Sequence, residues 1–321
     1  MQVTKAKREQ IKVPILLMGA SGSGKTLGAL LIAKGMIERM HPKLGEDKQW
    51  DKIGVIDTEH KRTNLYVDTE HDGIRIGEFP KVDLQAPFTS NRYLDAFQSL
   101  ISYGCEVVIV DGISNAWSDE GGVLQQVDNY AGGTGGMQGW KSVSGEQRSF
   151  LHLLTNEDVH VIATARSKQG VEVTKDDNGK LHVEKIGLKI EQKDSLEYEF
   201  AIAFQIYENH IAQATKDNSS IFNQPTELSR DVGNKIVDWA EKGIDVKAEE
   251  NERVQKAVKQ INDMVKDSEG GQMELKRQIM AANNIPIDNW SLNRLKVLYV
   301  GIKKIVGLEN QTNLTTEKEG K

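Results

Sequence analysis

A glycine-rich loop near the N-terminus constrains the fold more than any other part of this chain. Residues 19–26 read GASGSGKT and fit the pattern G-x-x-x-x-G-K-[ST]. Glycines in this pattern allow tight backbone turns, so that successive N–H groups point at phosphate oxygens. We expect Lys25 to reach the β- and γ-phosphates and the Thr26 hydroxyl to bind Mg²⁺. The candidate nucleotide-binding residues are Gly19, Ala20, Ser21, Gly22, Ser23, Gly24, Lys25 and Thr26.

The segments on either side of the loop are those that a phosphate-binding loop requires. Residues 13–18 are apolar and predict a buried strand, and residues 27–40 have the spacing of a helix. The N-terminus of that helix would place partial positive charge beneath the phosphates. A chance glycine-rich turn does not explain this series of strand, loop and helix, so we expect a nucleotide. We expect ATP, but the loop contacts only the phosphates and therefore does not identify the base of the nucleotide.

Further apolar runs predict the rest of a sheet. Strands are expected at residues 52–57, 106–111, 159–165 and 199–206, and helical spacing recurs between them, for example at 89–102. This alternation predicts an α/β fold with a mostly parallel or mixed sheet covered by helices on both faces. Alternating residues around a predicted turn at 176–180 indicate an exposed hairpin as well.

Two carboxylates follow predicted strands at positions that suit metal binding and catalysis. Asp111 ends the strand at 106–111, where it would lie beside Thr26 and hold Mg²⁺ directly or through water. The next residue, Gly112, cannot act as a base, although many phosphate-loop families have a glutamate there. Glu59 is the best remaining candidate to orient or deprotonate the attacking water. The alternatives are an ordinary strand-end aspartate at 111 and a solvated acid at 59.

A glycine-rich segment lies in the middle of the chain. Five glycines fall between residues 132 and 139, and glycine disfavours the interior of helices and strands. We therefore predict a mobile loop from Gly121 to Trp140, which carries Met137 and Trp140 and is followed by Lys141. The loop is either a flexible connection or a segment that orders on a partner or a nucleic-acid strand, with Trp140 stacking on bases.

Composition limits where the protein works. The net charge of −6 argues against a uniformly basic nucleic-acid coat protein but permits a local basic groove. Cys105 is the one cysteine, so no internal disulfide can form, and residues 1–10 are charged without an apolar signal region. No run of about 18 apolar residues is present. We expect a cytoplasmic protein with no membrane association.

The sequence predicts four segments. These are an N-terminal arm (1–11), a nucleotide-binding domain (12–245), a helical module (252–306) and a polar, disordered tail (308–321). The helical module either binds DNA or a partner, or only packs on the core and mediates assembly.

Three motifs together resemble the RecA-like recombinase core. They are the loop at 19–26, DTEH at 57–60 and VVIVDG at 107–112. The closer resemblance is to phage-encoded RecA-like ATP-binding proteins linked to single-strand annealing and recombination. Their later motifs are similar to KIEQKDSLEYEF at 189–200 and ATKD at 214–217. The resemblance covers residues 11–243.

The resemblance implies roles for matching positions. It makes Glu59 the catalytic residue and places Arg166, Lys168 and Gln169 where the γ-phosphate is sensed and a second DNA-binding loop starts. The segment at 131–142, with Trp140 and Lys141, matches the first DNA-binding loop. Lys216 matches the position from which a neighbouring subunit inserts a cation onto the γ-phosphate, with Lys193 as the weaker alternative. A homo-oligomer is therefore expected.

The leading hypothesis is a DNA-stimulated ATPase that acts on single-stranded DNA in phage recombination or replication, with ATP and Mg²⁺ as cofactors. One alternative is a motor ATPase of the packaging or helicase type. Another is a nucleotide-switched binding protein with little turnover, which loads or assists a single-strand-binding protein.

Overall fold

The computed structural model describes residues 5–130, 137–175, 181–192 and 196–319. The chain divides into two compact units, one formed by Ile11–Lys242 and the other by Met1–Gln10 together with Gly243–Lys321.

A mostly parallel sheet forms the centre of the unit Ile11–Lys242. Its core strands are β1 (Pro14–Gly19), β2 (Ile53–Asp57), β6 (Val107–Asp111), β7 (His160–Lys175) and β9 (Ile202–Ile206). Along the sheet the order is β11-β10-β9-β1-β7-β6-β2-β5. The edge strands are β5 (Lys81–Asp83) and β11 (Thr226–Glu227), and β10 (Ile211–Asp217) lies between β11 and β9. The core strands pair in parallel, whereas β10 runs antiparallel to both β9 and β11. The predicted α/β fold is therefore confirmed.

Helices cover both faces of the sheet because its strands are apolar on both faces. On one face, Ile15 and Leu17 of β1 belong to a core shared with α1 (Lys25–Met40) and α7 (Arg230–Ala240). On the other face, the alternate residue Leu16 belongs to a core shared with α3 (Ser90–Tyr103) and α6 (Met137–Leu154). The remaining elements are α2 (Glu46–Trp50), η1 (Arg62–Tyr66), β3 (Glu70–His71), β4 (Ile74–Arg75), α4 (Asn115–Ser118), α5 (Val123–Tyr130) and η2 (Leu196–Glu199).

Parallel register brings the predicted site residues together along the edge of the sheet where the carboxyl ends of its parallel strands lie. Asp57 pairs with Asp111, and Asp111 pairs with Thr164. Gly19, which begins the glycine-rich loop, pairs with Arg166. Because strands β1, β2 and β6 all end at this edge, their following loops meet there beside β7.

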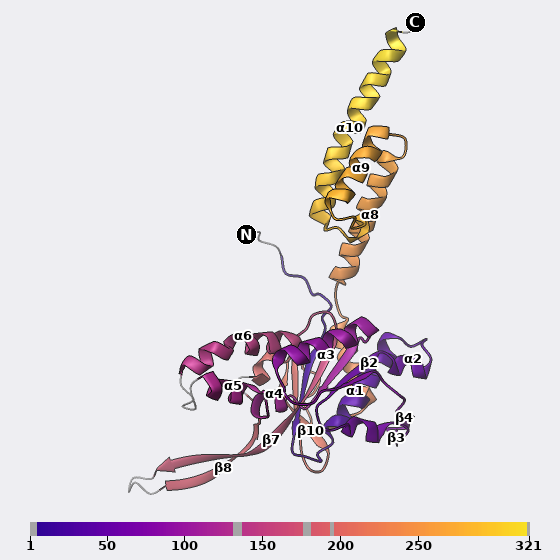
Figure 1. Cartoon of the computed structure of the whole chain (residues 1–321). Helices are drawn as coiled ribbons and strands as arrows, with labels where there is room; N and C mark the ends of the chain where they lie inside the picture. The colour runs from indigo at the N-terminus through magenta and orange to yellow at the C-terminus, as the bar shows by residue number, and fades with distance from the viewer. Residues whose placement is uncertain (1–4, 131–136, 176–180, 193–195, 320–321) are drawn as a thin grey trace. The chain divides into compact units, whose positions relative to one another are not determined.

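Strand β7 continues beyond the sheet. Its residues from Ser167 to Lys175 pair antiparallel with β8 (Leu181–Ile190), and together they form a two-stranded ribbon that leaves the sheet (Figure 1). The predicted hairpin is confirmed, and its predicted turn at 176–180 lies outside the described residues. The ribbon begins at the residue that follows Arg166.

The prediction of a loop from Gly121 to Trp140 is wrong where the structure describes it. Residues Val123–Tyr130 form α5, and α6 begins at Met137 and includes Trp140 and Lys141. Residues 131–136 lie outside the described part. At position 139 the helix α6 packs so closely against α5 that only glycine fits. A Cβ atom there would lie 2.4 Å from the Val127 carbonyl oxygen. The ring of Trp140 packs on that of Trp117, with their centroids 5.9 Å apart.

In its described residues, the second unit contains three α-helices, α8 (Val246–Val265), α9 (Glu269–Ala281) and α10 (Leu292–Glu319), with the short η3 (Ile287–Asn289). Side chains cap two of them: Asp245 accepts from Ala248 N, and Ser268 from Gly271 N. Their apolar core includes Ile261, Leu295 and Ile302. The N-terminal segment forms backbone hydrogen bonds with Ile244. Gln10 N donates to the Ile244 carbonyl oxygen, and Ile244 N donates to that of Arg8.

Residues 308–319, for which the sequence predicts a disordered tail, continue α10 in the structure, and their disorder stays a prediction. This stretch contains neither glycine nor proline, so nothing in its backbone ends the helix that precedes it. No helix in the described part of the chain is both long and apolar enough to span a membrane.

Candidate functional site

The glycine-rich loop joins β1 to α1 with a backbone that other residues adopt poorly. Gly22 and Gly24 have positive φ angles of 82° and 93°. At Gly19 the limit is space, since a Cβ atom there would lie 2.9 Å from the carbonyl oxygen of Ile206. The glycines of the motif are therefore required by this geometry.

Lys25 lies at the start of α1 and folds back over the loop. Its Nζ donates to the carbonyl oxygens of Gly19, at 3.0 Å, and Ala20, at 2.7 Å. Burial lowers the pKa of Lys25, and the carboxylates of Asp111 and Glu59 oppose this effect. An ammonium group has three protons, so one remains to donate to a phosphate oxygen.

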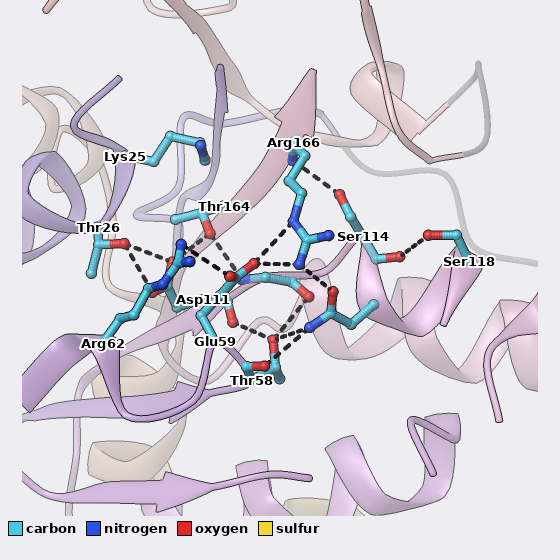
Figure 2. Close-up of polar contacts among 12 residues, drawn as sticks. Lys25, Thr26, Thr58, Glu59, Arg62, Asp111, Ser114, Ser118, Thr164 and Arg166 are labelled. Atoms are coloured by element: carbon cyan, nitrogen blue, oxygen red, sulfur yellow. Dashed lines mark hydrogen bonds and ion pairs between the residues drawn. The ribbon is translucent and has the colours of Figure 1, made fainter. Parts of the chain in front are cut away.

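Asp111 is buried at the end of β6 between two threonines. Thr26 Oγ1 donates to Asp111 Oδ2 at 2.9 Å, and Thr164 Oγ1 donates to Oδ1 at 2.6 Å (Figure 2). Burial raises the pKa of Asp111 to about 6, although the hydrogen bonds from Thr164 and Thr26 lower it. A hydroxyl and a carboxylate side by side are the oxygen donors that Mg²⁺ takes beside phosphate oxygens, so the two residues fit this ion.

Glu59 follows β2, and Asp57 shapes the turn that carries it. Asp57 Oδ1 accepts from Glu59 N at 2.9 Å, and Oδ2 accepts from Thr63 N at 3.1 Å. The bend directs the Glu59 side chain toward Asp111 and Arg166 and leaves it 16% exposed (Figure 2). The structure therefore brings the predicted catalytic carboxylate to the predicted phosphate and metal residues.

Two arginines bind the Glu59 carboxylate. Arg166 donates to Oε1 from Nε at 3.1 Å and from Nη2 at 2.7 Å, and Arg62 Nη1 lies 3.4 Å from Oε2. Arg166 Nη2 also donates to Asn115 Oδ1 at 2.8 Å. The carboxylate is therefore neutralised by its surroundings.

These side chains line one cleft of about 330 Å³. Its walls include the loop, both carboxylates, Thr164 and Arg166, together with Leu27, Arg62, Leu65, Tyr66 and His210. Sequence reasoning missed Arg62, Tyr66, Asn115 and His210. Arg62 and Tyr66 belong to the segment directly after Glu59, which was a usable signal. No sequence signal pointed to His210. It lies in the turn between β9 and β10, and the pairing of β9 with β1 brings this turn beside Gly24.

Three of the other predicted residues, all within the described part of the chain, do not line this cleft. Trp140 and Lys141 are on α6, and Lys168, whose Nζ is 3.8 Å from Glu191 Oε1, is on the ribbon. Gln169 is on β7, and its side chain lies outside the described part. Lys193 is also outside it.

Lys216 is not brought to the cleft of its own chain. It pairs with Ala203 in the first half of β9, whereas Ile206 at the other end of β9 pairs with Gly19 of the loop. Its Nζ donates to the carbonyl oxygen of Tyr198.

The fold and this cleft together define a P-loop nucleoside triphosphatase. Residues 11–242 match the family model described as an AAA domain, which is well over half of the chain. The chain therefore belongs to the AAA domain family, which indicates a nucleotide-binding ATPase. No curated protein matches the chain.

Proposed function

We propose that the protein binds ATP with Mg²⁺, hydrolyses it, and acts on single-stranded DNA in phage recombination or replication. The observation that carries the hydrolytic part is the shared cleft of Lys25, Asp111 and Glu59. These three residues suit phosphate binding, metal binding and activation of water.

The chain's own residues have separate tasks in this proposal. Loop N–H groups and Lys25 bind the β- and γ-phosphates, and Thr26 and Asp111 hold Mg²⁺, which neutralises phosphate charge when bound. Glu59 accepts a proton as a water oxygen forms a bond to the γ-phosphorus and the bond to the β–γ bridging oxygen breaks. The carboxylate must be released from its arginines before it can do so.

The DNA-binding part rests on the RecA-like motifs and on the position of the ribbon. The β7–β8 ribbon starts at Ser167, directly after Arg166 of the cleft. A DNA strand bound on the ribbon would therefore contact a segment that is joined directly to the nucleotide site. Lys168 on the ribbon, and Lys141 and Trp140 on α6, are the candidate contacts. Lys216 lies away from its own cleft, so its proposed role on the γ-phosphate requires a second copy of the chain.

Phosphate release from ATP tests the proposal. It is measured with and without single-stranded DNA for the wild type and for Glu59→Gln, with the exposed Glu46→Gln on α2 as the matched control. We expect DNA to stimulate release in the wild type and the control but not in Glu59→Gln. Release that DNA does not change would contradict the DNA-binding part, and release that survives in Glu59→Gln would contradict the assignment of Glu59.

One observation favours a second function, a nucleotide-switched binding protein with little turnover that assists a single-strand-binding protein. Glu59 is bound by two arginines, which leaves its carboxylate poorly placed to activate water. Bound ATP without phosphate release under any condition would support this function over the first.

A further inference from the structure

His210 lies in the short turn that joins β9 to β10. Tyr207 N donates to the carbonyl oxygen of Ile211 at 2.9 Å, and His210 N donates to that of Tyr207 at 3.0 Å. The φ angle of His210 is 64°, in the left-handed region where glycine and asparagine fit best. Glycine would fit this turn at lower cost, so the turn alone does not explain the imidazole. Residues held in such conformations cluster at functional sites.

The imidazole is fixed against the phosphate loop. Its Nδ1 lies 3.1 Å from the carbonyl oxygen of Ser23, and a Cβ atom at Gly24 would lie 3.2 Å from the same nitrogen. A carbonyl oxygen can only accept, so Nδ1 carries the hydrogen and donates it. In the neutral ring, Nε2 is then a hydrogen-bond acceptor.

Strand order places His210 on the side of the loop opposite to the catalytic carboxylate. In the sheet, β9 borders β1 on one side, and β7, β6 and β2 follow on the other. Glu59, Asp111 and Arg166 belong to that second side, whereas His210 lines the same cleft from the β9 side. A nucleotide whose γ-phosphate lies beside Glu59 and whose β-phosphate lies in the loop would extend its sugar toward the opposite side, which is that of His210.

An acceptor nitrogen distinguishes between the parts of a nucleotide. Ionised phosphate oxygens only accept hydrogen bonds, whereas the hydroxyl groups of the sugar can donate. We propose that Nε2 of His210 accepts a hydrogen bond from a ribose hydroxyl, so that His210 selects nucleotides that carry this hydroxyl. The inference rests on the proposed function, since it requires that a nucleotide bind in this cleft, but it does not depend on hydrolysis.

The test compares two nucleotides that differ only in the sugar. Affinities for ADP and for 2′,3′-dideoxy-ADP are measured by calorimetry with Mg²⁺, for the full-length wild type and for His210→Phe, which keeps a ring but has no nitrogen. The wild type should bind ADP about 5–10-fold more tightly than the dideoxy nucleotide, as one net hydrogen bond gives. His210→Phe should bind the two with equal affinity. His152→Phe, at an exposed histidine on α6, is the matched control and should keep the wild-type ratio.

The ratio of the two affinities separates contact with the sugar from other roles of the imidazole. A histidine that contacts a phosphate, or that only supports the loop through Ser23, predicts that His210→Phe weakens both nucleotides by the same factor. An unchanged ratio in His210→Phe would therefore overturn the proposal, as would a wild type that binds the two nucleotides equally. If His210→Phe does not fold, His210→Gly replaces it, because glycine favours the positive φ angle of this turn.

The outcomes also separate this inference from the proposed function. A wild type that binds neither nucleotide would contradict the nucleotide-binding function itself. Normal binding of ADP with no discrimination between the sugars would overturn the role of His210 alone.

Discussion

Thr26 Oγ1 donates a hydrogen bond to Asp111 Oδ2 at 2.9 Å, although 85 residues separate them in the chain. The contact arises because β1 and β6 both end at the same edge of the sheet, on either side of β7. We predict that Asp111→Asn weakens Mg²⁺-dependent ATP binding by about 10–100-fold, since an amide is a poorer partner for the cation than a carboxylate. Nucleotide affinity measured in EDTA should change little, because the loop and Lys25 remain.

The matched control for that prediction is Asp95→Asn, an exposed aspartate on α3. It should leave both affinities as they are. Equal loss of affinity with and without Mg²⁺ in Asp111→Asn would mean that the aspartate supports the loop and not the cation.

Two glycines of α6 should respond in opposite ways to alanine. A Cβ atom at Gly139 would lie 2.4 Å from the Val127 carbonyl oxygen, whereas nothing lies within 4 Å of one at Gly145. We expect Gly139→Ala to lower the free energy of unfolding by about 1–3 kcal/mol through overpacking. Gly145→Ala should raise it by up to about 1 kcal/mol, because alanine favours the helix. Urea unfolding of both variants tests this, and a stabilising Gly139→Ala would show that α5 does not pack on α6 in this way.

The buried imidazole of His160 should make stability depend on pH. Its Nδ1 accepts from Val13 N at 3.0 Å, and burial lowers its pKa to about 3 from the ordinary 6.5. The lowered pKa means that the unfolded chain binds a proton at a pH where the folded chain does not. The stability that neutral His160 provides is therefore fully present above pH 6.5 and is lost as the pH falls toward 3.

Between pH 7 and pH 5 this effect should lower the free energy of unfolding by about 2 kcal/mol. His160→Asn keeps a hydrogen-bond acceptor but cannot titrate, so its unfolding free energy should fall less over the same range. Chemical denaturation at pH 7, 6 and 5 measures the difference, and parallel curves for the two proteins would rule out His160 as the source.

Local sequence predicted the parts of the site that follow strands directly, but not the parts that depend on strand order. The loop at 19–26, Asp111 and Glu59 each come after an apolar run, so their positions at one sheet edge followed from the pattern. His210 reaches the cleft only through the pairing of β9 with β1, and Asn115 reaches Arg166 only through the pairing of β6 with β7. The helix around Gly139 was missed because the packing of α5 overrides the low helix propensity of glycine.

Lys216 pairs with Ala203 of β9, whereas Gly19 of the loop pairs with Ile206, so Lys216 does not line the cleft of its own chain. If it acts on the γ-phosphate of a neighbouring copy, Lys216→Ala and Glu59→Gln should each abolish most phosphate release when tested alone. An equal mixture should recover about a quarter of wild-type release, because that share of randomly formed interfaces combines an intact Glu59 with an intact Lys216. Lys235→Ala, an exposed lysine on α7, is the control and should remain active. A mixture as inactive as its components would mean that Lys216 does not act across an interface. Full activity of Lys216→Ala alone would remove it from the mechanism.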